Sequence, residues 1–194
     1  MPPLFSSYAT MEIQPDSNLI FHYEQILEYQ LDACDLILIE TVSNLSEGEA
    51  ALKVASSTGK PVIIAFCVDD MEPTKLRSGA LLSDGITMSR NYPVQALLLN
   101  CSRPEAIQQA VSLFDQNIMF GVYPNGFESV TPLQPDTTVD SLKENINFGP
   151  EEFTTWSLNM RDHGASYLGG CCRITPAHMR ELALRLNEEA QAGA

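Results

Sequence analysis

Three cysteines in the second half of the chain have the type and spacing that favour metal chemistry. Cys101 follows an apolar run, and the neighbours Cys171 and Cys172 follow two glycines. Thiolate sulfur selects zinc over Mg²⁺ and Ca²⁺. Three protein ligands leave one tetrahedral position open, which is typical of a catalytic zinc site. A buried core position is the alternative for each of them, because cysteine is among the most buried residue types.

The chain has five cysteines, an odd number in a protein too long to need disulfide bonds for stability. Reduced thiols are therefore expected. Cys34 is predicted to be buried, and Cys67 is a rival metal ligand. A disulfide between the adjacent Cys171 and Cys172 would need a strained geometry and is not expected. A thiol-redox protein that uses this pair is nevertheless one alternative function.

Five short apolar runs, which do not alternate with polar residues, are predicted to be strands. Strands that are buried on both faces have this pattern, which is typical of a parallel sheet covered by helices. The runs are residues 36–39, 62–66, 96–99, 118–122 and 166–168.

The segments around these runs carry helix signals. Apolar residues recur at helical spacing in residues 18–33, and S-x-x-E patterns at 46–49 and 102–105 predict two capping boxes. Further helices are predicted to begin at Pro150 and at Thr175. The order is one helix followed by five strand–helix units, which predicts an α/β fold with a parallel sheet.

The residues that end the expected strands are the candidate site. In a parallel α/β fold the carboxyl ends of the strands meet on one side, where ligands bind. Two long connections, 69–95 and 124–149, are predicted to be loops over this side. Cysteines far apart in the sequence are thus expected to meet in space.

The composition excludes some classes of partner. The chain has 25 Asp+Glu against 11 Lys+Arg, a formal net charge of -14, and such a surface repels nucleic acid and anionic membranes. The longest apolar run, 61–68, is far shorter than the ~20 residues that span a bilayer. The first basic residue is Lys53, so a signal peptide is not expected. We therefore expect a soluble, cytoplasmic protein that binds neither nucleic acid nor membranes.

Several motifs, in chain order, resemble those of the homocysteine S-methyltransferase family. The double-cysteine motif is the most specific, and the resemblance covers essentially the whole chain. The opening residues 2–8 are similar to the loop after the third barrel strand of that family. The other matching segments are 40–41, SEGEA at 46–50, the strand at 61–64, Asn-Cys at 100–101, VYPN at 122–125, GGCC at 169–172 and TPAH at 175–178.

The resemblance implies a zinc-dependent (β/α)8 barrel, known as a TIM barrel, with Cys101, Cys171 and Cys172 as the zinc ligands. The sulfur of homocysteine would take the open fourth position, where zinc lowers the pKa of its thiol. The resulting thiolate would attack a methyl group on a sulfonium or betaine-type donor and give methionine.

The resemblance also assigns substrate contacts. The acidic residue of the family near the amino group of homocysteine corresponds to Glu40, and a solvated loop acid is the alternative for this residue. Further contacts with the substrate are predicted at Thr41, Asn100, Asn125 and Gly170.

The first part of the family pattern has no counterpart in this sequence. The first three barrel strands, and an early Asp-Gly-Gly segment whose acid also holds the amino group, have no counterpart here. We therefore expect one incomplete barrel domain over 1–194, in which five strand–helix units correspond to strands 4–8. Open edges are expected at residues 36–39 and 167–170, and such edges favour self-association.

Two functional hypotheses follow from this incompleteness. In the first, the methyltransferase activity belongs to a longer protein and the 194-residue chain alone has little activity. In the second, the chain is a non-catalytic, zinc-binding remnant. The long C-terminal arm of betaine-using relatives is not found in the sequence, which favours S-methylmethionine or S-adenosylmethionine as the donor.

Overall fold

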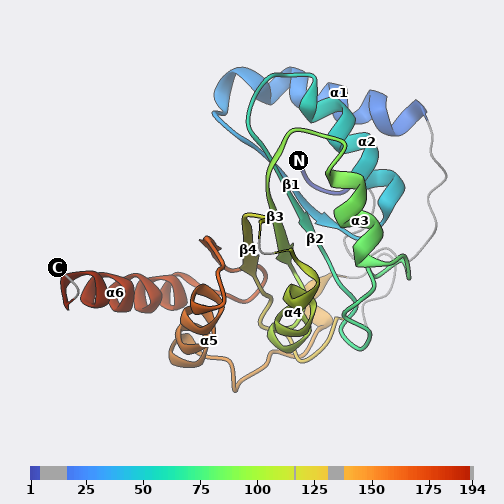
Figure 1. Cartoon of the computed structure of the whole chain (residues 1–194). Helices are drawn as coiled ribbons and strands as arrows, with labels where there is room; N and C mark the ends of the chain where they lie inside the picture. Colours follow the sequence, from blue (N-terminus) through green and yellow to red (C-terminus); the bar gives the residue numbers. More distant parts are fainter. Residues whose placement is uncertain (5–16, 116, 131–137, 193–194) are drawn as a thin grey trace.

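A parallel five-stranded sheet organises the computed structural model, which describes residues 1–4, 17–115, 117–130 and 138–192 (Figure 1). The strands lie in chain order, and each pairs in parallel with the next. The elements are α1 (Ser17–Gln30), η1 (Leu31–Ala33), β1 (Ile37–Val42), α2 (Leu45–Ser56), β2 (Val62–Phe66), α3 (Leu82–Ser89), β3 (Val94–Asn100), α4 (Pro104–Ala110), η2 (Val111–Leu113), β4 (Phe120–Tyr123), η3 (Val139–Ser141), α5 (Pro150–Asp162), β5 (Tyr167–Leu168) and α6 (Pro176–Ala192).

This order confirms the predicted helix followed by five strand–helix units. Neighbouring parallel strands joined by helical crossovers are the repeating unit of a TIM barrel, so the fold is a partial barrel. The described sheet is open, with β1 and β5 at its two edges as predicted. The self-association expected from these edges stays a prediction.

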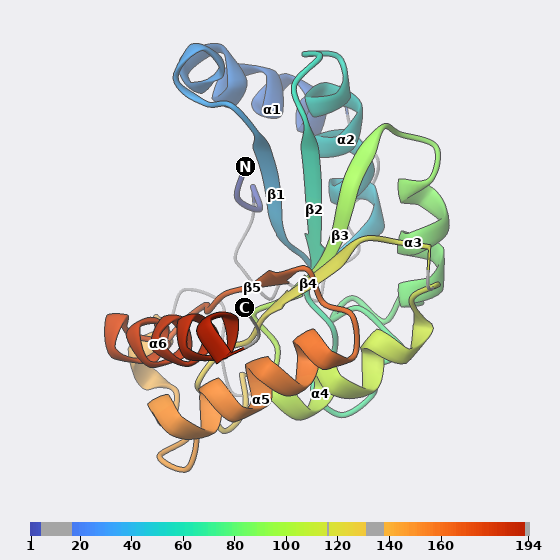
Figure 2. The ribbon, with the colours of Figure 1, turned by 60° about the vertical axis from the view of Figure 1, so that its left-hand side comes forward.

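The two faces of the sheet have different neighbours. Figure 2 shows the helices arranged around the outer side of the curved sheet. Side chains such as Ile39, Ile64 and Leu99 pack there in the main core. The opposite side, which we call the inner face, carries Leu38, Ile63, Ala65, Ala96, Leu98, Tyr123 and Tyr167. Because successive side chains point to opposite faces, two apolar faces produce the unbroken apolar runs of the sequence.

The predicted loop 69–95 contains a helix, α3, that the sequence reading missed. Its eight residues include polar Ser83, Asp84 and Thr87, so its apolar pattern is short. Gly85 lets α3 pack closely on β2, because a Cβ at this position would lie 3.0 Å from the ring of Phe66. The helix is therefore defined by its packing on β2 more than by its own periodicity.

Both predicted capping boxes are wrong in detail. The cap of α2 is Asn44, whose side chain accepts a hydrogen bond from the backbone N–H of Ser46 at 2.9 Å. The helix α4 begins at Pro104, and the Ser102 hydroxyl instead contacts the backbone of Val68. The side chain that caps α2 therefore lies outside the S-x-x-E pattern. In the second pattern, the serine hydroxyl bonds to another loop and not to the start of α4.

The first residue of the chain lies along the outer edge of β1. The Met1 ammonium donates to the Leu38 carbonyl at 2.5 Å, and the Glu40 N–H donates to the Met1 carbonyl at 3.1 Å. These two bonds reproduce the pairing of a parallel strand over a single residue. Most of the predicted opening loop, residues 5–8, lies outside the described residues. None of the helices described is long and apolar enough to cross a membrane.

A buried carboxylate attaches this N-terminal segment and α1 to α2. Glu47 is 4% exposed, accepts the backbone N–H of Leu4 at 2.6 Å and accepts the hydroxyl of Tyr23. Burial raises the pKa of Tyr23 well above its ordinary value, and the negative charge of Glu47 raises it further.

Replacement of Tyr23 by Phe tests this attachment. The variant should lose about 2 kcal/mol of unfolding free energy at neutral pH, because one hydrogen bond to a buried carboxylate is lost. Above about pH 10 the Tyr23 hydroxyl ionises in the unfolded chain and not in the folded chain, so stability falls as pH rises. Urea denaturation should therefore show a shallower alkaline loss for Tyr23→Phe than for the wild type.

The matched control is Tyr29→Phe, since Tyr29 lies on the same helix and is 84% exposed. It should change neither the neutral stability nor the alkaline slope. Equal alkaline slopes for Tyr23→Phe and the wild type would show that Tyr23 is not shielded from ionisation in the folded chain.

Candidate functional site

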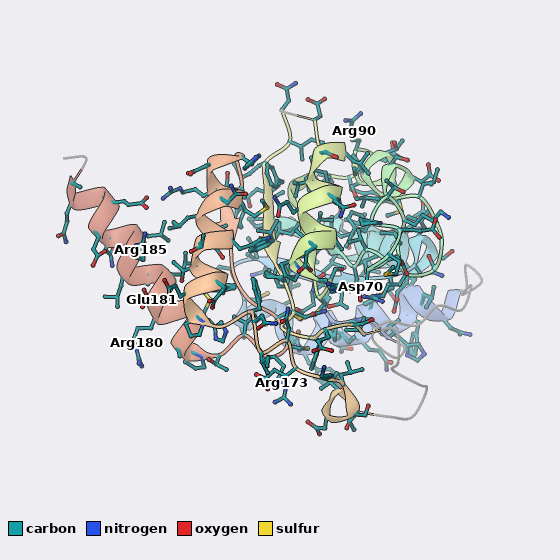
Figure 3. All side chains as sticks on the ribbon, turned by 90° about the horizontal axis from the view of Figure 1, so that it is seen from below. Asp70, Arg90, Arg173, Arg180, Glu181 and Arg185 are labelled. Carbon is teal, nitrogen blue, oxygen red and sulfur yellow. A yellow bond between two sulfur atoms is a disulfide. The ribbon has the colours of Figure 1, made fainter. Side chains whose placement is uncertain are left out.

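The structure brings the three predicted cysteines together at the side where the strands end. Cys101 follows β3, Cys171 and Cys172 follow β5, and their three sulfur atoms all lie within 4.8 Å of one another. Figure 3 views the molecule from this side. The expectation that cysteines distant in the sequence meet in space is therefore confirmed.

Two of the three cysteines are joined by a disulfide, which corrects the expectation of three reduced thiols. The bond links Cys101 and Cys171, whose Cα atoms lie 5.5 Å apart, a separation that suits a disulfide. The adjacent pair considered for a redox function is not bonded, since Cys172 is not part of the disulfide. A metal would need the bond reduced, because thiolates are the ligands.

The donor set fits zinc once it is reduced. Zinc–sulfur bonds of about 2.3 Å in a tetrahedron place sulfur atoms about 3.8 Å apart. The sulfur atoms of Cys171 and Cys172 are 3.9 Å apart, and Cys101 completes the group. Among the described residues the cluster holds only these cysteines, so Cys67 is not part of it.

The backbone at two strand ends adopts a conformation that L residues rarely take. Thr41 has φ 60° and Cys101 has φ 49°. Asn100 donates to the Thr41 hydroxyl at 2.8 Å and accepts the Thr41 N–H at 3.1 Å, and Asn125 donates to the Cys101 carbonyl at 2.8 Å. Such conformations cost about 1–3 kcal/mol each. The two asparagines therefore hold the strand ends, including the backbone of a metal-ligand candidate.

These bonds assign structural partners to three of the predicted substrate contacts. Asn100 and Asn125 are 0% exposed and Thr41 is buried, with their polar groups directed at the backbone or at each other. Glu40 is half-buried and, by strand alternation from Leu38, belongs to the inner face. Direct contact of these residues with substrate stays a prediction.

The turn that presents Cys171 and Cys172 depends on glycine. A Cβ on Gly170 would collide with the side chain of Ile174, which folds back over it. The N–H of Cys171 donates to Pro124 at 2.9 Å, and the carbonyl of Cys172 accepts the N–H of Gly126 at 2.8 Å. Gly170 is exposed, and its predicted substrate contact stays a prediction. The double-cysteine turn is thus fixed against the loop after β4.

A buried ion pair lies beneath the site, and the sequence reading missed it. Arg77 Nη2 lies 3.0 Å from Asp70 Oδ1, with side chains only 4% and 1% exposed. Asp70 also accepts the backbone N–H groups of Arg103 at 3.1 Å and Val130 at 3.3 Å. Figure 3 shows Asp70 among the packed side chains of the molecule. This one carboxylate joins the loops after β2, β3 and β4.

Cys67, the predicted rival ligand, belongs to this buried network. Its sulfur accepts the Nε–H of Arg77 at 3.2 Å, contacts the Ser102 hydroxyl at 3.5 Å and donates to the Cys101 carbonyl at 3.5 Å. Burial raises the pKa of the Cys67 thiol, and the opposing effect of Arg77 does not reverse this. Cys67 is therefore a protonated structural thiol that supports the Cys101 backbone.

Comparison with known proteins shows which family the chain is similar to. A profile described as homocysteine S-methyltransferase matches residues 2–186. Homocysteine S-methyltransferase 2 of Arabidopsis thaliana is 28% identical over 86% of this chain and 49% of its own length. Selenocysteine Se-methyltransferase of Brassica oleracea var. italica is 26% identical over 94% of this chain and 51% of its own length. The chain spans about half the length of these relatives.

Solved structures of the homocysteine methyltransferase MmuM from Escherichia coli have a similar fold. The metallated form aligns with a TM-score of 0.65 and 26% identity, over 86% of this chain and 52% of that one. The oxidized form aligns with a TM-score of 0.63 over the same shares. The family profile covers β3, β5 and the three cysteines that follow them. The chain belongs to the homocysteine S-methyltransferase family.

Proposed function

We propose that this chain binds one zinc ion through Cys101, Cys171 and Cys172 and takes part in zinc-dependent methyl transfer to homocysteine. The observation that carries the proposal is the meeting of three sulfur atoms, within 4.8 Å, at the ligand-binding side of a parallel sheet. Three thiolates leave a fourth position for the sulfur of the substrate. Family membership supports the reaction class.

The bound zinc and Glu40 would have different roles in the methyl transfer. Zinc, when bound, lowers the pKa of the homocysteine thiol so that it is a thiolate at neutral pH. Glu40 would accept a hydrogen bond from the substrate ammonium on the inner face. The thiolate would form a bond to the methyl carbon of the donor, whose own bond to that carbon breaks and leaves its electron pair on the donor atom.

The proposed donor is a sulfonium, either S-methylmethionine or S-adenosylmethionine. A sulfonium carries a positive charge, and the net charge of -14 favours the approach of cations over anions. Transfer leaves the donor neutral, because its sulfur retains the electron pair. Product release is then not held back by attraction between the donor and the acidic chain.

Zinc content of Cys101→Ser tests the metal site. Reduced wild-type chain dialysed against buffered zinc should retain about one zinc per chain, and the variant should retain much less because one of three thiolate ligands is lost. Elemental analysis, with thiol titration of the same samples, gives both numbers. The control is Cys34→Ser, because Cys34 lies outside the cysteine cluster and its sulfur contacts the Leu31 carbonyl at 3.6 Å. Equal zinc in wild type and Cys101→Ser would contradict the assignment.

Proton release on homocysteine binding tests the role of that metal. Calorimetry at pH 7 in two buffers of different ionisation enthalpy should show about one proton released when homocysteine binds the zinc-loaded chain. No release is expected from the reduced, zinc-free chain. Mass spectrometry after addition of S-methylmethionine or S-adenosylmethionine then shows which donor yields methionine. Binding without proton release would rule out a metal-bound thiolate.

Arg77→Met tests whether the buried ion pair supports the site. The variant should lose about 3–5 kcal/mol of unfolding free energy, because the Asp70 carboxylate is left buried without its partner. Its zinc affinity should fall as well, since Asp70 anchors the loops beside Cys101. The control is Arg90→Met, because Arg90 pairs with Asp115 at 3.8 Å on the surface and should change stability by less than about 1 kcal/mol. Similar losses in the two variants would contradict a supporting role for Asp70.

A further inference from the structure

The hydroxyl group of Tyr123 is buried and has no hydrogen-bond partner in the part of the chain that the structure describes. Buried tyrosine hydroxyls usually find a partner, since an unpaired one loses its bonds to water without replacement. The ring is held in place, because Tyr123 packs against the apolar residues of the inner face. The orphaned hydroxyl therefore lacks an acceptor that the described residues do not supply.

The position of Tyr123 relates this hydroxyl to the cysteine cluster. Tyr123 ends β4 and lies opposite Asn100 in the register of β3 and β4. Its carbonyl accepts the N–H of Cys101 at 3.2 Å, so its backbone directly supports a metal-ligand candidate. The side chain projects to the inner face, at the strand end nearest the site.

Glu40 lies on the same inner face as Tyr123, on the edge strand β1. Strand alternation from Leu38 places it on the inner face of β1. Burial raises the pKa of Tyr123, and the negative charge of Glu40 raises it further. No hydrogen bond joins them among the described residues. The inner face thus carries one acceptor, on β1, and one donor, on β4.

We propose that Tyr123 donates its hydroxyl hydrogen bond to the carboxylate of the amino-acid substrate, while Glu40 accepts from the ammonium of the same molecule. An α-amino acid carries an ammonium and a carboxylate on the same carbon. A hydrogen-bond donor and an acceptor on the same face of the sheet would therefore bind both charged groups of the zwitterion. Tyr123 is then a residue that determines specificity for amino-acid thiols over simple thiols. The inference rests on the proposed function.

The test compares two thiols on the reduced, zinc-loaded chain. L-homocysteine carries ammonium and carboxylate, whereas 3-aminopropane-1-thiol is the same molecule without the carboxylate. In Tyr123→Phe the affinity for homocysteine should fall by roughly tenfold or more, the size expected for a hydrogen bond to a charged group. The affinity for 3-aminopropane-1-thiol should be unchanged. Calorimetry measures both, and the zinc content should equal that of the wild type.

The matched control is Tyr167→Phe. Tyr167 lies on the same inner face and pairs with Gly121, two residues before Tyr123 and further from the strand ends. Its replacement should leave the affinity for both thiols unchanged. A loss that is equal for the two thiols in Tyr123→Phe would show a packing role and overturn the inference.

The outcomes also separate this inference from the proposed function. If the zinc-loaded wild type binds homocysteine and Tyr123→Phe binds it equally well, the inference is wrong and the proposed function stands. If the wild type binds neither thiol while it retains zinc, the proposed function is wrong and the inference is overturned with it.

Discussion

The carboxylate of Asp70 is the group on which the site geometry depends. It is 8% exposed as a residue, and its two oxygens bind Arg77 and the backbone N–H groups of Arg103 and Val130. These partners belong to the loops after three neighbouring strands, so their separation is set by one rigid group. Burying a charge is costly unless it is fully paired. The satisfied pairing explains how long loops hold a defined arrangement beside Cys101.

The polar side chains at the strand ends mostly form hydrogen bonds with the main chain. Asn100 and Asn125 bind the main chain at or beside Thr41 and Cys101, where the left-handed conformation needs support. Ser102 joins β2 to β3 in the same way. A cysteine held in a strained but fixed conformation loses little freedom when its sulfur binds a metal. Preorganisation of this kind is what a three-ligand site requires.

The sequence predicted the strands, their order and the meeting of the cysteines, because apolar runs and strand-end motifs are local signals. It did not predict α3, whose Gly85 is explained by the ring of Phe66. It also missed Asp70, since nothing near this residue in the sequence shows that Arg77 and Val130 would be its partners. The disulfide of Cys101 was missed for the same reason. Long-range partners become visible only in the fold.

The pairing of Met1 with β1 has a practical consequence for handling the protein. The ammonium group donates to Leu38 and the carbonyl accepts from Glu40, a residue of the candidate site. A purification tag fused ahead of Met1 would leave from this same sheet edge, close to Glu40. The far end of α6, which ends at Ala192, projects away from the sheet in Figure 1. Immobilisation through that end would keep the strand ends accessible to small molecules.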